Sequence, residues 1–141
     1  MHRNFTIKMG IILVQSPYEL DIHNFYDFQQ FQYSVSNRTL NLVWHRSVRE
    51  GTPSTLPASV IIEFCDITEF RFRPRDAQMP FSEDSCVRSF GYWTDEEWAN
   101  DSVMICFDSQ PNSTERLNAI DFMSGALIIV QADSAHATIV A

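Results

Sequence analysis

The stretch "FQQFQYSVSNRTLNLVWHRS", residues 28–47, decides the fold class. Apolar side chains occupy every second position on both sides of a polar turn at Asn37 and Arg38: Phe31, Tyr33 and Val35 before the turn, and Leu40, Leu42 and Trp44 after it. A period of two residues is typical of a strand with one buried face and one solvated face. The sequence therefore predicts an antiparallel hairpin with one wet face.

The same period recurs on either side of this hairpin. It predicts a strand over residues 5–14, one long bent strand or two short ones over residues 59–73 with a break near Asp66, a strand over residues 102–108, two strands joined by a turn at Ser124 and Gly125, and a short last strand over residues 137–140. We expect one all-β, mainly antiparallel domain, residues 1–141, built as a β-sandwich or partly closed barrel of about eight strands. One or two short helices are expected in the connections.

Two connections carry helix signals. Ser16 is placed as an N-cap, with Pro17 at the first helical position and Glu19 at the position that closes a capping box. Ser82 is placed to cap a second short helix, which Gly91 would end. These patterns predict helical turns after Ser16 and Ser82.

The charge balance of the chain limits its partners. Among 141 residues, 18 Asp and Glu stand against 10 Lys and Arg, which gives a formal net charge of −8. A surface of this sign repels nucleic-acid phosphates and anionic lipid headgroups, so neither nucleic acid nor a membrane is an expected partner, and a basic protein is favoured. The alternative is that the surplus carboxylates only keep the domain soluble.

The cysteines and histidines show no site pattern. Cys65, Cys86 and Cys106 are an odd number at wide spacing, which argues against a disulfide framework or a zinc knuckle and favours a reducing, cytoplasmic location. The four histidines are dispersed, and the chain has no nucleotide-binding, hydrolase or metalloprotease motif. The sequence therefore predicts no metal, no cofactor and no catalytic residue, and it favours a non-enzymatic protein.

One long connection combines acidic and aromatic side chains: "PFSEDSCVRSFGYWTDEEW", residues 80–98. Tyr and Trp are enriched among the residues that dominate protein interfaces, and surrounding carboxylates steer a cationic partner. We predict a partner-binding surface made of Glu83, Asp84, Tyr92, Trp93, Asp95, Glu96, Glu97 and Trp98. The alternative is that these aromatic side chains pin the connection to the core.

Arg71, Arg73 and Arg75 recur at every second residue. If the strand continues as far as Arg75, the three guanidinium groups lie on one face and can bind a carboxylate or phosphate by bidentate contacts. The alternative is a solvated face paired with carboxylates of a neighbouring strand.

Three functions of different classes follow from these features. The leading hypothesis is protein binding through residues 81–101. The first alternative is a small-ligand binder, in which Phe and Trp side chains line the mouth or interior of a closed barrel around an apolar cavity. The second is a hydrolase, which requires a histidine and a carboxylate that converge in a cleft with a perturbed pKa.

A resemblance to known families is carried by three segments: "NFYDFQQFQYSVSNRTLNLVWHRS" (residues 24–47), "VIIEFCDITEFRF" (60–72) and "FMSGALIIVQADSAHATIV" (122–140). They resemble small β-sandwich domains of uncharacterised bacterial proteins and of immunity-protein families from polymorphic toxin systems. The resemblance runs in outline from Asn24 to Val140, and the insertion from Arg75 to Asp101 has no counterpart. It implies a non-enzymatic cytosolic protein that binds and blocks a toxin, a basic one on charge grounds, and it identifies no binding residue.

Overall fold

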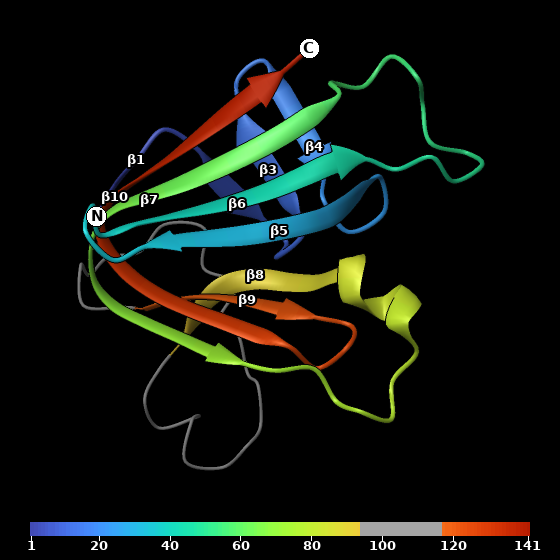
Figure 1. Cartoon of the computed structure of the whole chain (residues 1–141). Helices are drawn as coiled ribbons and strands as arrows, with labels where there is room; N and C mark the ends of the chain where they lie inside the picture. Colours follow the sequence, from blue (N-terminus) through green and yellow to red (C-terminus); the bar gives the residue numbers. More distant parts are fainter. Residues whose placement is uncertain (94–116) are drawn as a thin grey trace.

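Strands form nearly all of the regular structure in the computed structural model, which describes residues 1–93 and 117–141 (Figure 1). In these two ranges the chain forms ten strands and one 3-10 helix: β1 (His2–Arg3), β2 (Thr6–Lys8), β3 (Ile12–Gln15), β4 (Tyr18–Asp21), β5 (Tyr26–Ser34), β6 (Thr39–Arg46), β7 (Ser59–Arg73), η1 (Phe81–Ser85), β8 (Val87–Trp93), β9 (Leu117–Phe122) and β10 (Leu127–Val140). The predicted all-β, mainly antiparallel fold is confirmed. The strand predicted over residues 102–108 lies outside the described residues.

The larger sheet has the strand order β5-β6-β7-β10-β9-β8, and β1 pairs with β10 in parallel. β7 and β10 are long and pair with each other from Ser59 and Val140 at one end to Arg73 and Leu127 at the other. The pairing of β6 with β7 covers only the first half of β7, and the pairing of β9 with β10 covers only the first half of β10. Because both long strands curve, the sheet folds over on itself into a half-barrel with β5 and β6 in one layer and β8 and β9 in the other (Figure 1).

The bend in β7 lies at the break that the sequence predicts. Asp66 has a left-handed backbone with φ of +56°. The register of β7 against β10 shifts close by, between Gln131 and Ala132. Such an irregularity bends a strand and increases its twist. β7 nevertheless runs from Ser59 to Arg73, so one long bent strand forms and not two short ones.

Two further bulges change which side chains face the core. The β5–β6 register shifts between Phe28 and Gln30, and the β8–β9 register shifts between Val87 and Ser89. An extra residue on one strand places side chains three positions apart on the same face. Phe28 and Phe31 therefore both face inward, opposite Trp44 and Leu42, and Val87 and Phe90 do so opposite Phe122 and Ile120.

The bulge in β8 explains why the helix predicted from Ser82 to Gly91 is wrong in extent. Val87 and Phe90 are three apart, which imitates helical spacing, but they belong to a strand. The 3-10 helix η1 covers only residues 81–85, its N-cap is Pro80, and no side chain caps it. Gly91 lies inside β8, paired with Ala119.

The N-terminal strand prediction and the helix prediction at Ser16 are also wrong. Residues 5–14 form two strands of a three-stranded sheet, β2-β3-β4, because Met9 and Gly10 both take positive φ and reverse the chain. β4 follows Pro17 directly and pairs with β3, so Glu19 lies on a strand opposite Val14. The burial of Leu20 and Ile22, two residues apart, outweighs the capping signal.

At the C-terminus, the turn at Ser124 and Gly125 is confirmed, and the separate last strand over residues 137–140 is wrong. These residues continue β10 without a break and pair with the first half of β7. The apolar face of the predicted hairpin is buried on its second strand, where Leu40, Leu42 and Trp44 are completely inaccessible to solvent. On the first strand it is not: Tyr33 is 37% exposed, and Val35, which lies beyond the end of β5, is 78% exposed. One core cluster joins these residues to side chains of the small sheet and of both layers of the half-barrel.

Candidate functional site

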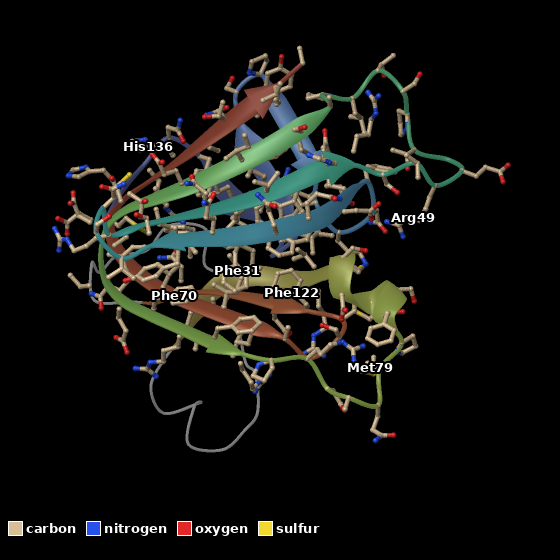
Figure 2. The ribbon with its side chains drawn as sticks, viewed as in Figure 1. Phe31, Arg49, Phe70, Met79, Phe122 and His136 are labelled. Atoms are coloured by element: carbon tan, nitrogen blue, oxygen red, sulfur yellow. The ribbon has the colours of Figure 1, made fainter. Side chains whose placement is uncertain are left out.

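The space between the two layers of the half-barrel holds an aromatic cleft of about 330 Å³. Four phenylalanines line it: Phe28 and Phe31 from β5, Phe72 from β7, and Phe122 from β9. Pro74, Ala126 and Ile128 complete the apolar wall. Figure 2 shows Phe31 and Phe122 between β5 and the opposite layer, with Arg49 and His136 far from them.

Ring contacts decide where the layers touch and where they stay apart. Tyr33 stacks on Phe70 with ring centroids 4.9 Å apart, and Phe31 lies 5.9 Å from the same ring. Phe31 also contacts Phe72 at 5.0 Å, and Phe28 contacts Phe122 at 4.8 Å. These tilted and stacked pairs hold β5 against β7 and β9, and the hollow lies among the rings of Phe28, Phe31, Phe72 and Phe122.

An ion pair lines part of this cleft. Arg75 Nε donates to Asp84 Oδ1 at 2.7 Å, and both side chains line the cleft. A second nitrogen of Arg75 donates to the carbonyl oxygen of Met79 at 2.5 Å, and its guanidinium lies 4.6 Å from the centre of the Phe81 ring. The loop after β7 and helix η1 are thereby held together beside the aromatic rings.

The three arginines predicted as one cationic stripe are placed separately. β7 ends at Arg73 because Pro74 follows, and proline has no backbone N–H for the ladder, so the strand does not continue to Arg75. Arg71 pairs with Glu69 of the same strand, and Arg73 donates to the carbonyl oxygen of Gly125. Of the three, Arg75 lines the cleft.

The predicted partner-binding residues fall into three groups. Glu83 and Asp84 lie in the first turn of η1, where Glu83 is half-buried and Asp84 is bound to Arg75. Tyr92 and Trp93 end β8, with backbones paired to Asn118 and Leu117. The others, Asp95, Glu96, Glu97 and Trp98, lie outside the described residues. A protein partner at this segment stays a prediction.

Asp121 is a buried carboxylate on β9, in the position before Phe122. It is 1% exposed, and Arg88 Nε donates to its Oδ2 at 2.6 Å. Its Oδ1 has no hydrogen-bond partner within the described parts of the chain. Removal from water raises the pKa of Asp121, and the Arg88 contact offsets this effect only in part.

A pair that the sequence analysis does not predict lies where β8 begins. The Cys86 sulfur is 3.6 Å from His23 Nδ1, and that nitrogen is 2.5 Å from the carbonyl oxygen of Val87. A carbonyl oxygen can only accept a hydrogen bond, so Nδ1 carries the hydrogen in this contact and does not serve as a base for the thiol. Burial raises the pKa of the Cys86 thiol, which disfavours the nucleophilic thiolate.

Titratable side chains in residues 1–93 and 117–141 form neither a metal-binding cluster nor a histidine–carboxylate ion pair. No group of three or more His, Cys, Asp or Glu side chains in this part could hold a metal ion. The ion pairs found there join carboxylates to arginine or lysine, so the histidine and carboxylate that a hydrolase requires are not paired in these ranges. None of the helical segments described is long and apolar enough to span a bilayer.

The fold and the site together define an antiparallel half-barrel with an aromatic cleft between its layers. Comparison of the chain with protein-family models, curated proteins and solved structures gave no match. The resemblance to immunity-type domains and the cytoplasmic location stay predictions.

Proposed function

We propose that this protein binds a small, largely apolar ligand in the aromatic cleft. Ligand sites in proteins are concave, mostly apolar and about 300–1,000 Å³ in volume, with a few polar groups that fix the ligand's orientation. The cleft, at about 330 Å³, has these properties at the small end of the range. Its polar groups are Arg75, Asp84 and Ser124.

The observation that carries this proposal is the unfilled space among four phenylalanines from three strands. Protein interiors are packed about as densely as organic crystals, and voids lined by apolar side chains forfeit dispersion contacts. Phe72, which lines this space, is 45% exposed, so a large apolar residue at the cleft is in contact with water. The ligand-binding hypothesis expects a closed barrel; here the cavity lies between the two layers of an open half-barrel.

Filling the cleft from its own wall tests the proposal. Ala126 lines the cleft just after the turn at Gly125, so Ala126→Trp would occupy the ligand's space without changing a strand. We expect wild type to bind the uncharged fluorescent probe N-phenylnaphthylamine saturably at one site, and Ala126→Trp to bind it at least about tenfold more weakly.

The matched control is Val48→Trp. Val48 is 99% exposed in the loop after β6 and does not line the cleft, so this variant adds an indole to the surface only. Circular dichroism and urea unfolding would check that both variants are folded. Equal probe affinity in wild type, Ala126→Trp and Val48→Trp would show that the cleft is not the binding site.

A further inference from the structure

A second hollow, of about 440 Å³, adjoins the aromatic cleft. The two share Phe28, Phe31 and Asp84. The second hollow, here called the amide hollow, adds Gln29, Gln30, Phe81 and Ser85. The two hollows are therefore neighbours with different chemistry, separated by no more than the side chains they share.

Neutral hydrogen-bonding groups line the amide hollow. Gln29 and Gln30 are both exposed on β5 beside the bulge, which places two consecutive side-chain amides at one edge. Gln29 Nε2 donates to the carbonyl oxygen of Asp27 at 3.1 Å, which orients the amide. Each amide offers both a donor and an acceptor, and Ser85 adds a hydroxyl, so the wall can pair with hydroxyl groups in either sense.

The charges beside this hollow compensate each other. Asp84 Oδ1 lies 2.7 Å from Arg75 Nε. The guanidinium would attract an anionic head group and the carboxylate would repel it, whereas a cationic head group would be attracted by the carboxylate and repelled by the guanidinium. An uncharged head group leaves this ion pair intact and keeps its own hydrogen bonds. The Phe81 ring, 82% exposed, adds an apolar face beside the amides.

We propose that the ligand is a small amphiphile whose apolar part fills the aromatic cleft and whose uncharged, hydroxyl-bearing head group binds in the amide hollow. This inference rests on the proposed function. It assigns Gln29 and Gln30 as specificity-determining residues, since they supply neutral donors and acceptors where a fatty-acid binder would place an unpaired cation.

Three probes with the same eight-carbon chain test the head group: octyl glucoside, octanoate and octylamine, each titrated into the full chain below its micelle concentration by displacement of N-phenylnaphthylamine. We expect octyl glucoside to bind about tenfold more tightly than either charged probe. Gln29→Ala combined with Gln30→Ala should remove that preference and leave octanoate binding unchanged.

Gln32→Ala is the matched control, because Gln32 is exposed on the same strand and lies outside both hollows. If octanoate or octylamine binds as tightly as octyl glucoside, or if the double variant keeps the preference, the inference is wrong and the proposed function still stands. If the dye binds and none of the three probes displaces it, the inference alone is wrong. If the dye itself does not bind, the proposed function is wrong, and the inference that rests on it is wrong too.

Discussion

At Asp121 the fold buries a carboxyl group that is ordinarily charged and hydrated. Its carboxyl group is almost fully removed from water, while its partner Arg88 is 54% exposed and so remains largely hydrated. An ion pair of this kind returns less Coulomb energy than a fully buried one and still bears the desolvation of one member. The raised pKa of Asp121 is the result.

This pKa makes stability depend on pH in a stated direction. Below the pKa of the unfolded carboxyl, ordinarily 3.8, Asp121 is protonated in both states. As pH rises through its higher folded pKa, the folded state must hold a buried charge, and stability is lost. We expect Asp121→Asn to lose less unfolding free energy than wild type between about pH 4 and pH 7, as measured by urea denaturation.

Asp133→Asn is the control for this series, since Asp133 is exposed and its substitution removes one negative charge from the surface. Its pH dependence should follow wild type. A parallel course of all three curves would mean that Asp121 does not contribute to the pH dependence.

At the scale of the element, the bend of β7 depends on one left-handed residue. Aspartate tolerates positive φ better than most residues, whereas a β-branched side chain there clashes with the backbone at a cost of about 1–2 kcal/mol. We expect Asp66→Val to lower the free energy of unfolding by about this amount, measured by urea denaturation.

Asp66→Asn separates backbone conformation from charge. Asparagine also accepts positive φ, and the exposed Arg38–Asp66 ion pair, at 3.2 Å, contributes little to stability. This variant should stay within about 0.5 kcal/mol of wild type. A loss as large as that of Asp66→Val would assign the effect to the ion pair instead.

Strict alternation predicted the hairpin of β5 and β6, but it also ran through residues 5–14, where a turn at Met9 and Gly10 divides the chain into β2 and β3. The hairpin of β5 and β6 and the break near Asp66 follow from a period of two and from a polar residue in an apolar run. The helix prediction at Ser16 failed because tertiary pairing overrode a local signal. Ser16 and Pro17 carry helix-start chemistry, but pairing with β3 and the burial of Leu20 place the following residues on a strand.

The candidate site was much less predictable than the strands. A bulge changes which side chains share a face, and the amino-acid sequence of one chain does not show where a bulge lies. Phe28 could therefore not be assigned to the same face as Phe31. Phe122 lies about ninety residues further along the chain and reaches Phe28 only through the order β5-β6-β7-β10-β9. The usable signal was the abundance of phenylalanine in amphipathic strands, which supported the ligand-binding alternative.

At the scale of the whole molecule, two strands belong to both layers. Residues 59–65 of β7 pair with β6, and residues 67–73 continue into the opposite layer, with β10 alongside throughout. Separating the layers would require breaking this ladder, so we expect amides in both halves of β7 and β10 to exchange with deuterium only through global unfolding.

Hydrogen exchange measures this directly. The free energy of exchange in both halves of β7 should equal the free energy of unfolding from urea denaturation, and amides of β2 in the small sheet should exchange faster. Exchange in residues 67–73 at a lower free energy than in residues 59–65 would show that one layer opens independently.

The continuity of these strands also determines how a ligand in the cleft would change the stability of the domain. Phe72 and Ile128, which touch the cleft, sit on the two strands that run through the entire domain. A compound bound there stabilises the native state by mass action, and the gain is shared by every segment hydrogen-bonded to that ladder. In a thermal shift assay the whole domain would therefore melt in one transition, at a higher temperature than without ligand and equally sharp.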